Sequence, residues 1–199
     1  HIYDVFTDQP FAGNQLGVVP DTSGLSAQTM QAIAREFNLS ETIFFLPPDN
    51  PEHAAKVRIF MPGGELPFAG HPTIGGAITY AGWKGLPKES LIILEERVGP
   101  ISCQVSADAQ GGYSCFTAAR LPEPMPFASS TAAVSKALGL TSGMIGFDAH
   151  KIMMTSGGVP YVTIPVVDLA ALRHAKVDPW PWLALDVEKE GKFAAPYLY

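Results

Sequence analysis

The segment from Pro72 to Trp83 places the strongest limit on what this chain can fold into, because it carries no charged side chain on any face. Pro72 stands where the first turn of a helix tolerates proline. A helix without a charged side is expected to be buried all round. Gly75 and Gly76 make it thin, so that neighbouring strands can approach closely. We therefore predict a helix over residues 72–83 that is wrapped by a curled sheet; an ordinary core helix is the alternative.

Segments with the pattern of strands surround this helix. Apolar residues alternate or run together between turn-forming residues in the stretches 2–7, 14–20, 42–47, 55–61, 91–96, 100–107 and 112–118. The first two of these predict a hairpin. Apolar residues from Met30 to Phe37 recur at helical spacing, which predicts an amphipathic helix over 26–37 with Ser26 as its N-cap. This mixture of helices and strands indicates an α+β fold.

A proline-rich stretch, Leu121 to Phe127, is the best domain boundary in the chain, with three prolines in five residues. It predicts a first domain over residues 1–120 and a second over 121–199. For the second domain we expect helices over 129–139 and 168–175 and strands over 144–148, 151–155, 159–166 and the tail from 192. A faint internal repeat relates residues 13–19 to 157–164, which suggests that the second domain is an incomplete copy of the first.

Composition excludes several classes of protein. The formal net charge is −6, the pI is about 5.3, and no run of Lys or Arg forms a basic patch, so nucleic acid is not an expected partner. No apolar stretch is long enough to span a membrane. The N-terminus lacks the basic start and apolar core of a signal peptide. Two cysteines are too few for a disulfide scaffold. We therefore expect a cytoplasmic protein.

Glu41 is the first candidate catalytic residue. It lies between the amphipathic helix and an apolar strand that begins Thr42-Ile43-Phe44. A carboxylate held against such a surface loses hydration, which suits it to giving and taking protons near neutral pH. A surface glutamate that merely follows a helix is the alternative.

The second candidate site is the start of the charge-free helix, Gly70-His71-Pro72-Thr73. Free backbone N–H groups and the helix dipole attract an anion at such a position, most simply a substrate carboxylate. Gly70 lets a ligand approach the backbone, and His71 can donate to a bound oxygen or relay a proton. Alternatively, these residues only turn a strand into a buried helix. His71 has no metal-ligand spacing with other residues, and no nucleotide-binding motif is present, so no metal and no cofactor are expected.

Three motifs occur in the same order within the first 75 residues. They are Phe11-Ala-Gly-Asn14 within 4–19, Asn38-Leu-Ser-Glu-Thr42 within 30–42, and Glu65-Leu-Pro-Phe-Ala-Gly-His-Pro-Thr73 within 58–75. Together they resemble the PhzF-like family, which is named after the isomerase of phenazine biosynthesis. The resemblance runs to about residue 96 and resumes over 155–166.

The resemblance implies the diaminopimelate-epimerase fold, in which two similar domains each wrap a barrel-like sheet around a central helix and the active site lies between them. It assigns the acid/base role to Glu41, and substrate binding and protonation to Gly70 and His71. Asn14, Ser40, Thr73 and Gly157 lie in or beside the matching segments and are the further candidate substrate-binding residues. The resemblance also implies catalysis without a cofactor, a small carboxylic or amino acid as substrate, and a homodimer.

The chain departs from the family pattern in two places. Gln15 replaces a proline or small residue, which is a minor change in a loop. The acidic, Gly-containing segment that forms the second half-site of the family is absent before Tyr199. We therefore predict a cofactor-independent, PhzF-like isomerase with an incomplete second domain. A non-catalytic binding or scaffold protein and a thiol-based epimerase that uses Cys103 or Cys115 are the alternatives.

Overall fold

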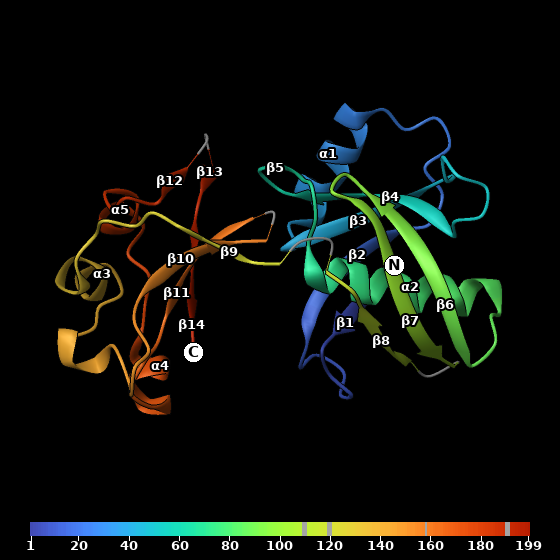
Figure 1. Ribbon diagram of the computed structural model, residues 1–199. Coiled ribbons are helices and arrows are strands. Elements are labelled where there is room, and N and C mark those ends of the chain that lie inside the picture. Colours follow the sequence, from blue (N-terminus) through green and yellow to red (C-terminus); the bar gives the residue numbers. More distant parts are fainter. Residues whose placement is uncertain (109–110, 119–120, 158, 190–191) are drawn as a thin grey trace. The chain divides into compact units, whose positions relative to one another are not determined.

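The computed structural model describes residues 1–199 except for 109–110, 119–120, 158 and 190–191 (Figure 1). The chain divides into two compact units, His1–Ala119 and Arg120–Tyr199. Each has a hydrophobic core of its own. No helix of the described residues is both long and apolar enough to cross a membrane.

The first unit is an eight-stranded sheet with strand order β1-β2-β3-β4-β6-β7-β8 and a short β5 paired to β4. Neighbouring strands are antiparallel except for the parallel pairs β2–β3 and β4–β6. The strands are β1 (Ile2–Val5), β2 (Asn14–Val19), β3 (Glu41–Leu46), β4 (Ala55–Met61), β5 (Gly64–Leu66), β6 (Glu89–Glu96), β7 (Gly99–Ala107) and β8 (Gly112–Phe116). Each strand predicted in this unit is present, as is the hairpin of β1 and β2.

The sheet curls around helix α2 (Gly70–Lys84), which contacts β1 at one end of the strand order and β8 at the other (Figure 1). An added Cβ at Gly75 would lie 2.7 Å from side-chain atoms of Leu16 and Val5, and one at Gly76 would lie 2.7 Å from Ile43. Glycine at these positions is therefore what allows the strands to reach the helix backbone. The prediction of a wrapped helix is confirmed, and α2 is not an ordinary core helix.

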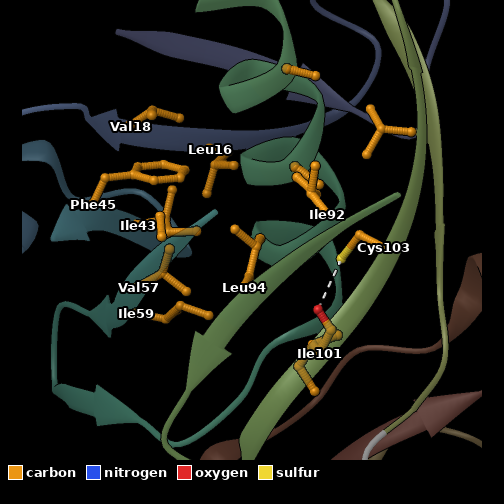
Figure 2. Close-up of a cluster of buried hydrophobic side chains, with 14 of the residues drawn as sticks. Leu16, Val18, Ile43, Phe45, Val57, Ile59, Ile92, Leu94, Ile101 and Cys103 are labelled. Atoms are coloured by element: carbon orange, nitrogen blue, oxygen red, sulfur yellow. Dashed lines mark hydrogen bonds between the residues drawn. The ribbon is translucent and has the colours of Figure 1, made fainter. Parts of the chain in front are cut away.

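The inward side chains of this sheet form the main core. Figure 2 shows them gathered around the helix, with Leu16, Ile43, Ile59 and Leu94 contributed by four different strands. All four are almost completely buried. Because burial on this scale stabilises each side chain by about 1.5–3 kcal/mol, the core holds the strands and the ends of α2 in fixed positions.

Helix α1 (Ala27–Phe37) covers the outer face of the sheet. The Ser26 side chain accepts a hydrogen bond from the backbone N–H of Thr29, so the predicted N-cap is confirmed. Met30 and Ala34 pack against Phe44 and Phe60 of β3 and β4. The helix ends at Asn38 in the left-handed conformation. This ending turns the chain sharply, so that Glu41 becomes the first residue of β3.

The second unit contains a four-stranded sheet with order β14-β11-β10-β9 and a separate pair of short strands, β12 and β13. Its strands are β9 (Glu123–Met125), β10 (Met153–Ser156), β11 (Pro160–Ile164), β12 (Glu188–Lys189), β13 (Lys192–Phe193) and β14 (Ala195–Leu198). Its helices are α3 (Thr131–Ala137), α4 (Leu169–His174), α5 (Pro179–Leu183) and the 3-10 turn η1 (Ser142–Met144).

Three details of this unit differ from the sequence prediction. The proline-rich stretch contains β9, an edge strand, where a missing N–H donor is tolerated. The predicted strand over 144–148 is a 3-10 turn followed by a single bridge between Ile145 and Val166. Helix α5 was not expected, because its Pro-Trp-Pro-Trp start hides the helical pattern.

Candidate functional site

Glu41 and His71 come together at one end of the first unit. Glu41 begins β3 and lies opposite Leu16 of the parallel strand β2, while His71 is the second residue of α2. Glu41 Oε2 lies 3.3 Å from His71 Nδ1. The wrapped sheet brings these residues together although thirty positions separate them in the sequence. The structure thus joins the two candidate sites that the sequence analysis treated separately.

The pair is sheltered from water. The Glu41 side chain is 20% exposed and the His71 side chain is 7% exposed. Glu41 Oε2 itself is buried, and it accepts no hydrogen bond of good geometry from the residues that the structure describes. The carboxylate therefore has one oxygen held close to an imidazole and out of contact with bulk water.

The contact of the second ring nitrogen of His71, Nε2, indicates which tautomer the neutral imidazole adopts. Nε2 lies 3.4 Å from the carbonyl oxygen of Gln15, to which only a protonated nitrogen can donate. We assign the Nε2–H tautomer on this basis, which leaves Nδ1 facing Glu41. Burial lowers the pKa of His71, while the charge of Glu41 and the Gln15 carbonyl act to raise it. The two side chains are therefore coupled electrostatically, because the charge of Glu41 favours the protonated imidazole that burial disfavours.

The first turn of α2 supplies backbone donors beside this pair. The helix begins at Gly70, two residues earlier than predicted, so Gly70 and His71 belong to its first turn. Their N–H groups have no carbonyl partner within the helix, and Pro72 has no N–H at all. The N-cap, Ala69, offers no side chain to bind them. Space around Gly70 is open, because an added Cβ would meet nothing within 4 Å.

Asn14 and Ser40 lie at the same end of the sheet as Glu41. Asn14 begins β2, and Ser40 immediately precedes β3. The Ser40 hydroxyl donates to Asn14 Oδ1 over 2.9 Å, and both residues are exposed. This bond ties the ends of two parallel strands together and leaves the Asn14 amide nitrogen available to a ligand.

Thr73 and Gly157 are placed differently. Thr73 is fully buried, and its hydroxyl oxygen lies 2.7 Å from the Ala69 carbonyl oxygen and 2.6 Å from Glu96 Oε1. Its side chain therefore faces the interior of the first unit. Gly157 follows β10 in the second unit and is half-buried.

Glu96 is a residue that the sequence analysis missed. It ends β6, where Ile92, Leu94 and Glu96 alternate on the buried face, and it is only 8% exposed. Burial raises the pKa of Glu96 to about 7, although the contact with Thr73 acts to lower it. A carboxyl group at an inward position of an apolar alternation was the signal that could have found it. Among the described residues, no group of three His, Cys, Asp or Glu could hold a metal ion.

Comparison with known proteins places this chain. An uncharacterized isomerase from Mesorhizobium japonicum is 49% identical over all of this chain and 66% of its own length. The trans-2,3-dihydro-3-hydroxyanthranilate isomerase from Pseudomonas chlororaphis is 35% identical over 89% of this chain and 60% of its own length. The chain therefore spans about three-fifths to two-thirds of the length of these relatives.

The solved structures agree with the predicted fold class. A predicted epimerase from Pseudomonas aeruginosa superimposes with a TM-score of 0.84 at 31% identity, covering 99% of this chain and 68% of that one. The curled sheet around a central helix is the predicted α+β, diaminopimelate-epimerase-like architecture. The family model for phenazine biosynthesis-like proteins, PhzC-PhzF, matches residues 3–196. The chain is therefore a member of the phenazine biosynthesis-like, or PhzF, family.

Proposed function

We propose that the protein containing this chain is a cofactor-independent isomerase that moves a proton within a small carboxylic or amino acid, with Glu41 as the acid/base. The contact between Glu41 Oε2 and His71 Nδ1 is the observation that carries this proposal. A sheltered carboxylate beside an imidazole can hold a proton without a metal or a cofactor. The isomerases among its relatives support the same class of reaction.

The proposed reaction needs only one proton and no redox step. The Glu41 carboxylate takes a proton from a carbon atom of the substrate, and the electron pair left behind spreads into the adjoining conjugated system. The same carboxyl group then returns the proton to a different carbon. Between the two steps Glu41 carries the proton, and His71 Nδ1, which lies 3.3 Å from Oε2, is close enough to interact with the carboxyl group.

Substrate binding is proposed at the first turn of α2. The N–H groups of Gly70 and His71 and the positive end of the helix dipole suit a carboxylate, and the space beside Gly70 admits it. Asn14, held by Ser40, offers an amide donor at the same end of the sheet. Gly157 remains a candidate from the second unit. These contacts favour a small acid, cyclic or derived from an amino acid, over a larger substrate.

The thiol-based alternative finds little support in the positions of the cysteines. Cys103 is fully buried in the core, and burial raises the pKa of its thiol to about 12, so it carries no reactive thiolate. Cys115 is exposed on β8 and lies in no glycine-rich loop. The scaffold alternative predicts that replacing Glu41 has no effect on any turnover, which the following experiment examines.

The decisive variant is Glu41→Gln. We expect turnover to fall by a factor of about 10² to 10⁴, the usual contribution of a positioned acid/base, while binding of the acid persists. Turnover is measured by NMR as conversion of small cyclic carboxylic acids into isomers in which a proton has moved between carbon atoms, beginning with trans-2,3-dihydro-3-hydroxyanthranilate. Glu36→Gln is the matched control, because it removes the same charge from an exposed position of α1. Full turnover in Glu41→Gln would end the assignment.

A further inference from the structure

The buried contact between Thr73 and Glu96 requires a hydrogen that the Thr73 hydroxyl group alone cannot supply. The Thr73 oxygen lies within 2.7 Å of two acceptors, the carbonyl oxygen of Ala69 and Oε1 of Glu96. A hydroxyl group has a single hydrogen and can donate it to only one of them. The carbonyl has no hydrogen to offer in return. The second short contact therefore needs a hydrogen from the carboxyl group of Glu96.

We propose that Glu96 is a positioning residue that acts as a neutral carboxylic acid, donating to Thr73 while Thr73 donates to Ala69, and so holding the first turn of α2 in place. Ala69 is the N-cap of α2, and the next two residues are Gly70 and His71. The chain of two hydrogen bonds ties this turn to the end of β6. The role in catalysis rests on the proposed function, whereas the hydrogen-bond chain itself does not.

The surroundings of Glu96 favour the neutral form. Its other oxygen, Oε2, is buried and has no hydrogen-bond partner among the described residues, and no described cation pairs with it. A carboxylate would leave a charge uncompensated there, whereas a neutral acid leaves only a weak acceptor. The burial that raises the pKa of Glu96 to about 7 agrees with this.

Among the described residues, the cations of β4 that line a pocket together with Glu96 pair with other carboxylates, Lys56 with Asp49 and Arg58 with Glu65. On β7, burial and the charge of Glu96 both raise the pKa of the Cys103 thiol, which therefore remains neutral. On α2, Thr73 is the polar contact. Along the strand, Arg97 pairs with Glu65, and Glu95 binds His53 and two backbone N–H groups. The proton on Glu96 therefore supplies the hydrogen for its short contact with Thr73.

The test combines a direct titration with amide exchange. The carboxyl group of Glu96, labelled with ¹³C and followed by NMR, is expected to titrate near pH 7. Exchange at the N–H groups of Thr73 and Ile74, corrected for the intrinsic pH dependence, is expected to accelerate as the pH rises through this value. We expect about a tenfold loss of protection, the usual effect of disrupting a buried hydrogen bond.

Two variants separate the hydrogen bond from mere packing. Glu96→Gln keeps a neutral donor for Thr73, so its protection should stay within about twofold of the protonated wild type and show no step near pH 7. Glu96→Leu fills the space without a donor, and its protection should fall about tenfold at every pH. Equal pH profiles in the wild type and Glu96→Gln would overturn the proposal. An ordinary, low titration of Glu96 in the wild type would overturn it as well, even if neither variant folded.

The outcome is independent of the proposed isomerase activity. If Glu96 behaves as expected but Glu41→Gln keeps full turnover, the hydrogen-bond chain stands and the isomerase assignment fails. If Glu41→Gln loses turnover but Glu96 titrates as an ordinary carboxylate, only the positioning role fails. Each proposal therefore has an observation of its own.

Discussion

At the scale of single residues, the site depends on the environment of ionisable groups rather than on their identity. Glu41 has a buried oxygen next to an imidazole, whereas Glu95 accepts two backbone N–H groups that lower its pKa to about 2. Glu96, one position further on, faces the core, and its pKa rises to about 7. Adjacent residues of a strand face opposite sides of the sheet. The pKa values of Glu95 and Glu96 are therefore shifted in opposite directions, although the two residues are neighbours in the chain.

The pKa of His71 depends on its contact with Glu41. Burial lowers its pKa, and the negative charge of Glu41 partly offsets that decrease. Replacing Glu41 by Gln removes the charge, so we expect the pKa of His71 to fall further below its ordinary value. A pH titration of the imidazole ring by NMR measures this shift, with Glu36→Gln as a control that should leave it unchanged. An unchanged or higher pKa in Glu41→Gln would mean that the two side chains do not interact in solution.

At the scale of elements, helix α2 combines a structural and a chemical task. Its middle is narrow enough for strands to close around it, and its first turn carries the backbone donors and His71. The strands that pack on Gly75 and Gly76 also place the ends of β2 and β3, where Asn14 and Glu41 begin their strands. Packing in the middle of the helix therefore fixes the geometry at its start.

Two glycine substitutions in α2 should have opposite effects. Gly75→Ala places a methyl group 2.7 Å from Leu16 and Val5, and we expect overpacking to cost about 1–3 kcal/mol of stability. Gly82→Ala meets nothing within 4 Å on the same helix, so the better helix propensity should stabilise by up to about 1 kcal/mol. Amide exchange of the core amides of α2 measures both. A neutral effect of Gly75→Ala would argue against close contact between the helix and the strands.

At the scale of the whole molecule, each of the two units has a main hydrophobic core of its own, and a smaller cluster lies under α1 in the first unit. The main core of the first unit includes Leu16, Ile43 and Leu94, and that of the second includes Leu138 and Val162. Both contain side chains that are completely buried. Glu41 and His71 belong to the first unit, and Gly157 belongs to the second.

Core substitutions should therefore destabilise one unit at a time. Leu16→Ala and Leu138→Ala each remove a fully buried side chain, with an expected cost of about 2–5 kcal/mol. In Leu16→Ala the loss of protection from amide exchange should be confined to the first unit, and in Leu138→Ala to the second. Each variant serves as the control for the other. Equal loss of protection in both units would show that they unfold as a single cooperative body.

Local patterns in the sequence predicted most helices and strands of the first unit and selected Glu41 and His71 as candidate site residues. Ser26 caps α1 as predicted, and the charge-free, glycine-rich stretch is the wrapped helix. Both could be predicted because a helix cap and a helix without charged residues are recognised from a few consecutive residues. The motif around Glu41 and the motif around His71 each likewise span only a few consecutive residues. Their chemical roles remain proposals, but the residues themselves could be selected from the sequence.

The tertiary structure alone decided which distant groups meet. The sequence does not show that β6 pairs with β4, that Glu96 contacts Thr73, or that the Gln15 carbonyl faces His71, since each is a contact between residues far apart in the chain. It also does not show that the proline-rich stretch contains a strand, because an edge strand tolerates proline only through its place in the sheet. Local propensity acts along the chain, whereas protonation and hydrogen-bond pairing depend on neighbours that only folding brings together.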